Sequence, residues 1–110
     1  MEKIILVGPR GCGKTTLAKA IISGNGVILS PCKKTSYRQL AVECFERVAF
    51  EEFRETECRY IKMLLTKDNQ FNLTHIVCTF LEQPKWLTKK FAKINNIKVF
   101  HLNSVDKINS

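Results

Sequence analysis

The sequence predicts an α/β fold: a four-stranded parallel sheet with helices on both faces. Two observations support this prediction. Largely apolar runs occur at residues 3–7, 27–29, 75–81 and 97–102, as expected of buried strands. The segments between them carry apolar residues three and four positions apart, which is typical of amphipathic helices. Because parallel crossovers are right-handed and the first strand is expected inside the sheet, the predicted spatial order is 2-3-1-4.

The composition indicates one small domain that spans residues 1–110. The chain is 45% hydrophobic and 25% charged, and no repeat or low-complexity segment divides it. No apolar stretch approaches the roughly 20 residues of a membrane span. We therefore expect a soluble cytoplasmic protein with no membrane partner. The cysteines are odd in number and lack C-x-x-C spacing, which argues against a disulfide framework or a zinc site. They are Cys12, Cys32, Cys44, Cys58 and Cys78.

The loop after the first strand carries the strongest functional signal. It fits G-x-x-x-x-G-K-[ST] at every position. Its residues are Gly8, Pro9, Arg10, Gly11, Cys12, Gly13, Lys14 and Thr15. Phosphate needs several converging N–H donors, and glycines let a loop bend closely around it. A helix predicted over residues 15–22 directs its free N–H groups and its positive dipole end at the same anion. The sequence therefore predicts a nucleotide phosphate site.

Residues 1–24 resemble the N-terminus of P-loop NTPases, a three-layer α/β fold, and the motif resembles the form found in ATPases and small-molecule kinases. The resemblance implies ATP and Mg²⁺ as ligands. It implies backbone donors from Arg10 to Thr15, with Lys14 on the terminal phosphates, Thr15 on Mg²⁺ and Thr16 near the α-phosphate.

Cys12 stands where families of this kind usually place a small residue. Its thiol lies beside the expected phosphate site, so we expect alkylation of Cys12 to block nucleotide binding. The segment after the second strand, residues 30–38, leaves two interpretations open. It lines the ligand crevice at the carboxyl end of that strand, or it is a solvated loop before a helix capped by Thr35 or Ser36.

A long amphipathic helix is predicted over residues 37–65, with a bend or division at residues 54–57. This segment gathers most of the acidic charge, which we interpret as a solvated helical face. The acidic residues are Glu43, Glu46, Glu51, Glu52, Glu55 and Glu57.

A catalytic acid is missing from its usual place. P-loop NTPases normally carry one at the end of an apolar strand, where it holds the Mg²⁺ shell or polarises water. The strand over residues 75–81 offers Cys78 and Thr79 near its end, with Glu82 beyond. Thr79 resembles the sensor-strand residue of many ATPases, which contacts the γ-phosphate or the attacking water. Four explanations stay open: Glu82 substitutes, a helical glutamate substitutes, a neighbouring copy in a homo-oligomer supplies the acid, or catalysis is feeble.

A further helix is predicted from residue 83, with Leu87, Phe91 and Ile94 on its buried side. Four lysines share its exposed face at helical spacing: Lys85, Lys89, Lys90 and Lys93. The net charge is +8, from 18 Lys and Arg against 10 Asp and Glu, and it favours nucleic acid as a partner. On this interpretation Trp86 stacks a base. The alternative is a solubilising lysine face with Trp86 in the core.

ATP is expected rather than GTP. Residues 103–106 partly match the guanine-reading N-K-x-D motif, but Ser104 replaces the lysine and no D-x-x-G precedes it. His75 and His101 adjoin strands and receive no chemical role.

Three functions remain open. In the first, a small virus-encoded ATPase acts with nucleic acid in the host cytoplasm, because residues 75–102 look like the sensor-strand region of viral DNA-packaging ATPases. In that family a double acid precedes the strand and a glutamine follows it; this segment lacks the acids, and Gln83 is displaced. The second is a mononucleotide or nucleoside kinase, since Tyr37-Arg38 and Pro84-Lys85 resemble positions in adenylate kinase. The third is a regulatory module that binds nucleotide and hardly hydrolyses it.

Overall fold

The computed structural model describes residues 1–31, 35–66 and 72–103. Five parallel strands form one sheet in the order β2-β3-β4-β1-β5. The strands are β1 (Glu2–Val7), β2 (Gly26–Leu29), β3 (Arg47–Glu51), β4 (His75–Phe80) and β5 (Ile97–His101). The helices are α1 (Lys14–Ile21), α2 (Thr35–Cys44), α3 (Arg59–Thr66) and α4 (Lys89–Ile94), with a 3₁₀ turn η1 (Glu55–Glu57) before α3. The predicted α/β class with a parallel sheet is confirmed.

The expected number of strands was wrong, since the sheet has five strands and not four. The four predicted strands keep their expected relative order, and β3 is inserted between the second and third of them. The helix predicted over residues 37–65 is therefore also wrong. It consists of α2, β3, η1 and α3. The division falls near residue 45, earlier than the expected break at residues 54–57.

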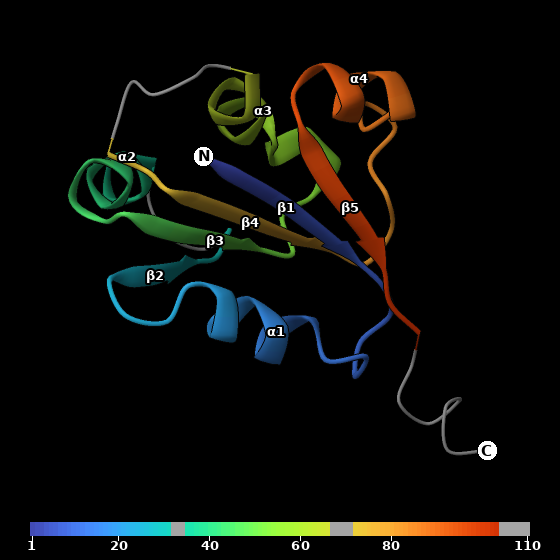
Figure 1. The fold of residues 1–110 in the computed structure, drawn as a ribbon, viewed down its shortest axis with the longest axis horizontal. Helices are drawn as coiled ribbons and strands as arrows, with labels where there is room; N and C mark the ends of the chain where they lie inside the picture. Colours follow the sequence, from blue (N-terminus) through green and yellow to red (C-terminus); the bar gives the residue numbers. More distant parts are fainter. Residues whose placement is uncertain (32–34, 67–71, 104–110) are drawn as a thin grey trace.

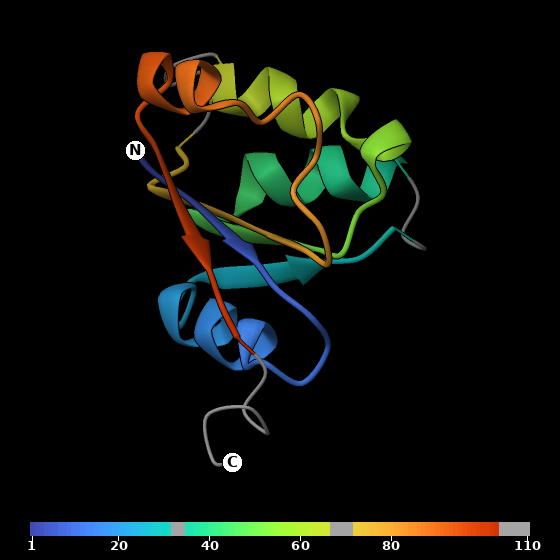
Figure 2. The same cartoon turned by 90° about the vertical axis from the view of Figure 1, so that its right-hand side faces the viewer.

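The sheet separates two unequal layers of helices. Helix α1 lies alone on one face, while α2, α3 and α4 cover the other (Figures 1 and 2). Side chains of β3 alternate between the layers. Val48 and Phe50 belong to the larger core, whereas Ala49 packs with Ala18 and Ile22 of α1. Because side chains two positions apart lie on the same face, the last residue of β3, Glu51, lies on the α1 side of the sheet with Ala49.

Helix α4 begins at Lys89, later than the predicted start at residue 83. Thr88 caps it, because its side chain accepts a hydrogen bond from the Phe91 N–H. The residues before it form a turn in which the Leu87 N–H donates to the Pro84 carbonyl over 3.0 Å. Leu87 is buried as predicted, but Ile94 is 66% exposed, so its expected place in the buried stripe is wrong.

Trp86 packs in the protein interior beneath α4. Its half-buried ring meets Phe80 and Phe91 edge to face, with centroids 6.2 and 5.4 Å away, and the Lys62 ammonium lies over it at 5.6 Å. These contacts favour the packing interpretation of Trp86 over base stacking.

Several sequence predictions fall outside the described residues. These are positions 32–34 of the segment at 30–38 and all but Asn103 of the partial N-K-x-D match. Within the described ranges, no helix is long and apolar enough to cross a membrane.

Candidate phosphate site with two acids

The glycine-rich loop joins β1 to α1 at the carboxyl edge of the sheet. Gly11 and Gly13 have φ values of 78° and 92°, a left-handed region that side chains rarely tolerate. Gly8 is needed for a different reason. A Cβ at this position would lie 2.6 Å from the Leu102 carbonyl oxygen and 2.8 Å from the Cys12 Sγ. The loop can therefore bend tightly against β5 only with these glycines.

Lys14 folds back over the loop that precedes it. Its side chain is 5% exposed, and the Nζ donates to the carbonyl oxygen of Gly8 and, at 3.0 Å, to that of Pro9. A cavity of about 420 Å³ opens beside it. The lining residues are Arg10, Gly11, Gly13, Lys14, Thr15, Thr16 and Glu52. Every lining residue except Thr16 and Glu52 comes from the motif, so the predicted loop forms a recess at the start of α1, which we call the phosphate recess.

Strand β3 brings an acid to this recess. Glu51 is its last residue and, with Ala49, lies on the α1 side of the sheet. The Thr15 hydroxyl donates to Glu51 Oε1 over 2.5 Å, across 36 positions of sequence. The acid that sequence reasoning missed therefore meets the motif residue expected at the metal. The signal was the apolar run at residues 48–50 followed directly by two glutamates.

A magnesium ion fits this pair of side chains. Mg²⁺ prefers hard oxygen ligands and is usually held by one or two protein oxygens together with substrate phosphates and water. The Thr15 hydroxyl, which lines the phosphate recess, and the Glu51 carboxylate, which accepts its hydrogen bond, supply such oxygens.

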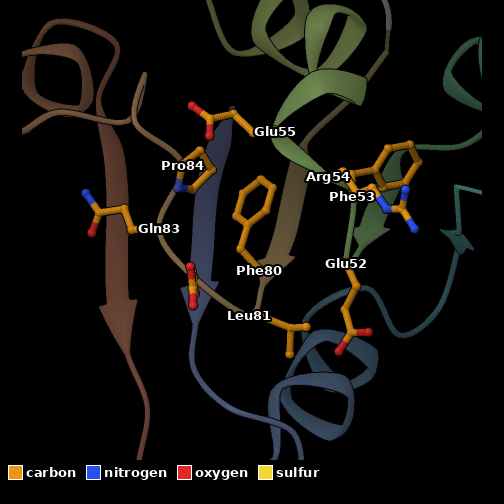
Figure 3. Close-up of a pocket in the computed structure, with 9 residues that line it drawn as sticks. Glu52, Phe53, Arg54, Glu55, Phe80, Leu81, Gln83 and Pro84 are labelled. Carbon is orange, nitrogen blue, oxygen red and sulfur yellow. The ribbon is translucent and has the colours of Figure 1, made fainter.

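Glu52 is held in an uncommon backbone conformation. Its φ of 52° lies in the left-handed region, although it is not a glycine. Its N–H donates to the Thr79 carbonyl oxygen at 2.9 Å and to Thr79 Oγ1 at 3.1 Å. Thr79 is 1% exposed and pairs with Glu51 in the sheet register. These bonds direct the Glu52 side chain toward the layer of α1, as Figure 3 shows.

Thr79 was expected to contact the γ-phosphate or the attacking water. Its hydroxyl is instead buried and bonded to the Glu52 backbone. Thr79 is therefore connected to the phosphate recess by its hydrogen bond to the backbone of Glu52, which itself lines the recess.

Glu82 lies in a different hollow. It is exposed and lines a cavity of about 380 Å³ together with Glu52, Phe80, Gln83 and other residues shown in Figure 3. It does not line the phosphate recess, whereas Glu52 lines both. Of the acids considered as substitutes, Glu51 is the one bonded to the motif.

A broader cavity of about 800 Å³ adjoins the two acids. Arg10 and Arg54 flank it, and Ser30 and Pro31 line it after β2. The start of the segment at 30–38 thus reaches the crevice. Helix α2 begins at residue 35, so Thr35 and Ser36 lie within the helix, and the expectation that one of them caps it was wrong.

The four predicted lysines are all exposed. Lys89, Lys90 and Lys93 belong to α4, but Lys85 precedes the helix, so the expectation that all four share helical spacing was wrong. The ion pair found among the described residues joins Lys98 to Glu2, at 3.3 Å, and includes none of these four. His75 and His101 begin β4 and end β5, respectively, as predicted.

Comparison with known proteins gives one family. The family model of PduV-EutP, described as "Ethanolamine utilisation - propanediol utilisation", matches residues 1–109. No curated protein matches the chain.

Proposed function

The chain belongs to the PduV-EutP family, a P-loop nucleotide-binding family of GTPase-like type, and on this premise we propose that it hydrolyses a nucleoside triphosphate with Mg²⁺. The bond broken is the one between the β- and γ-phosphates. The observation that carries the proposal is the 2.5 Å hydrogen bond from Thr15 to Glu51, which unites the phosphate loop with an acidic strand end.

Each residue has a defined task in this proposal. The Lys14 ammonium exchanges its loop carbonyls for the β- and γ-phosphate oxygens and stabilises the charge that develops on the bridging oxygen. Thr15 and Glu51 would hold Mg²⁺, which neutralises phosphate charge when bound. Glu52 accepts the proton of the water that attacks the γ-phosphorus, because its side chain lines the recess beside Lys14.

The acid pair strengthens the resemblance to packaging-type ATPases. In that family a double acid ends the strand before the sensor strand, and here Glu51 and Glu52 follow β3 and precede β4. We propose ATP as the preferred nucleotide. No glycine follows Gly26, so the D-x-x-G that accompanies guanine reading has no counterpart in this chain. GTP, which the family favours, is the competing substrate in the assay.

Phosphate release from MgATP and MgGTP tests the proposal. We expect Glu52→Gln to lower kcat by about 10²- to 10⁴-fold, the usual contribution of a general base, with KM nearly unchanged. Glu51→Gln should raise the Mg²⁺ concentration needed for half-maximal rate. Glu82→Gln is the matched control, since it removes a neighbouring exposed carboxylate that does not line the recess. If Glu82→Gln lowered kcat more than Glu52→Gln, the general base would be Glu82 and not Glu52. Tight binding without hydrolysis in the wild type would favour a regulatory module.

The broader cavity favours a second candidate function, a mononucleotide kinase. Its volume of about 800 Å³ suits a small ligand, and Arg10 and Arg54 flank it beside the two acids. A kinase would transfer the γ-phosphate to an added nucleoside monophosphate. The kinase would be identified if added adenylate or thymidylate were converted to its diphosphate without release of free phosphate.

Nucleic acid is the proposed macromolecular partner. The four exposed lysines Lys85, Lys89, Lys90 and Lys93 form no ion pair among the described residues, so their charge is available to phosphates. We place the activity in the cytoplasm, where the thiols of Cys12, Cys44, Cys58 and Cys78 stay reduced.

A further inference from the structure

A hollow of about 430 Å³ lies between α4 and β5, apart from the phosphate recess. Its lining residues are Gln83, Thr88, Lys89, Ala92, Lys93, Ile97, Val99 and His101, and we refer to it as the α4–β5 hollow. Helix α4 packs beside β5, as Figure 1 shows. The three other cavities described above each include glutamates, whereas the described lining of this hollow contains no carboxylate.

The rim of the hollow is cationic. Lys89 and Lys93 are four positions apart on α4, which places both on the same side of the helix. Both are exposed, and neither forms an ion pair among the described residues. His101 stands across the hollow at the end of β5. Because no described lining residue is a carboxylate that could pair with them, the two ammonium groups attract an anion with two or more phosphates.

The floor of the hollow is apolar. Ile97 is 8% exposed, and Ala92 and Val99 are partly buried against the core. A surface of this kind cannot satisfy a phosphate, but it can bury one face of an unpaired base or a sugar. A double helix presents its bases edge-on within grooves and would leave this floor uncovered. A cationic rim over an apolar floor therefore suits a single strand better than a duplex.

The far wall is fixed by Gln83. Its amide nitrogen donates to the Leu87 carbonyl oxygen over 2.5 Å, and its Oε1 accepts from the His101 Nε2–H over 2.7 Å. The side chain extends toward β5 in Figure 3. Gln83 also lines the cavity that contains Glu52, so the same short loop borders the hollow and the acid of the proposed hydrolytic site.

We propose that the α4–β5 hollow is the binding site for single-stranded nucleic acid, with Lys89 and Lys93 on successive phosphates and a base over Ile97 and Val99. This inference rests on the proposed nucleic-acid contact and narrows the four-lysine surface to the pair that borders a cavity. Lys85 and Lys90 contribute to the general field and do not line the hollow.

Fluorescence anisotropy with a labelled 20-nucleotide oligothymidylate, titrated at several salt concentrations, tests the site. Each phosphate contact to a single strand contributes about 0.7 to the slope of log K against log salt. Lys89→Gln with Lys93→Gln should therefore lower the slope by about 1.4 and the affinity at 0.1 M salt by about 25-fold. The matched control, Lys85→Gln with Lys90→Gln, removes the same charge from the same region and should lose less than about 5-fold.

A third variant probes the floor without changing charge. Ala92→Leu fills the hollow and should weaken oligonucleotide binding several-fold while leaving the salt slope unchanged.

If the two double-lysine variants lost equal affinity for the oligonucleotide, the hollow would not be the binding site, and the general lysine surface would remain as the explanation. A duplex of the same length that binds more tightly than the single strand would also overturn it. If the wild-type protein binds no oligonucleotide, the nucleic-acid proposal is wrong altogether. The proposal of nucleotide hydrolysis is tested independently, because phosphate release is measured without oligonucleotide.

Discussion

Replacement of Thr79 by valine isolates the contact that holds Glu52. Valine has nearly the shape of threonine, so the buried site loses a hydroxyl without gaining a large cavity. The Glu52 N–H keeps the Thr79 carbonyl oxygen at 2.9 Å and loses the Oγ1 acceptor at 3.1 Å. A hydrogen bond of this kind contributes about 0.5–1.5 kcal/mol, which is comparable to the cost of a left-handed residue other than glycine. The valine variant therefore frees Glu52 to leave its φ of 52°.

We expect kcat to fall about 2- to 13-fold. This is the factor by which a loss of about 0.5–1.5 kcal/mol of transition-state stabilisation lowers a rate. Nucleotide affinity should stay within a factor of two, because no loop residue changes. Thr79→Ser, which retains the hydroxyl, should recover most of the rate. Thr74→Val is the matched control, since the Thr74 hydroxyl donates to the Glu46 carbonyl oxygen at the opposite end of β4. Steady-state phosphate release measures all four proteins. A kcat unchanged in Thr79→Val, or lowered equally in Thr74→Val, would refute the positioning role.

Three further predictions concern the loop. Lys14→Ala should weaken ATP binding by about 10- to 150-fold in calorimetry, the loss of one charge-assisted hydrogen bond, and wild-type affinity would remove the site from the loop. Gly8→Ala should destabilise the fold by about 1–3 kcal/mol in urea unfolding, because its Cβ would meet the Leu102 carbonyl oxygen; an unchanged midpoint would mean that the loop shifts freely. In a background with both Cys32→Ser and Cys44→Ser, alkylation of half-exposed Cys12 at pH 8 should abolish nucleotide binding. Burial raises the pKa of Cys58 to about 11 and keeps that thiol unreactive, so retained affinity after full modification of Cys12 would contradict this expectation.

The sequence predicted correctly those parts of the fold where the spacing of apolar residues fits either a strand or a helix but not both. The runs that became β1 and β4 are short and largely apolar, and their positions were predicted to within a residue at each end. The phosphate loop was found in full, because its glycines, lysine and threonine each have a physical reason at a fixed spacing.

Strand β3 was missed because two periods fit it. Phe45, Val48 and Ala49 continue the three-and-four spacing of α2, and this signal extended the predicted helix over the strand. Tertiary contacts decide between the periods. Val48 and Phe50 are buried on one face of the sheet and Ala49 on the other, which only a strand between β2 and β4 allows. Because this strand was missed, the two acids that we propose for catalysis were missed as well: Glu51 and Glu52 look like part of a solvated helical face unless a strand ends there.

The position of β4 explains why the site joins residues so far apart in sequence. Strand β4 lies between β1, which leads into the phosphate loop, and β3, which ends in the acids. Glu51 therefore reaches Thr15 across the width of β4, on the face that α1 covers. The last polar side chain of β4 on that face is Thr79, and it bonds the backbone immediately after Glu51. The intervening strand thus sets the distance between loop and acids and also holds the second acid in place. A substitution at the end of β4 should therefore lower kcat and leave nucleotide affinity, which depends on the phosphate loop, nearly unchanged. The Thr79 variants compare these two quantities.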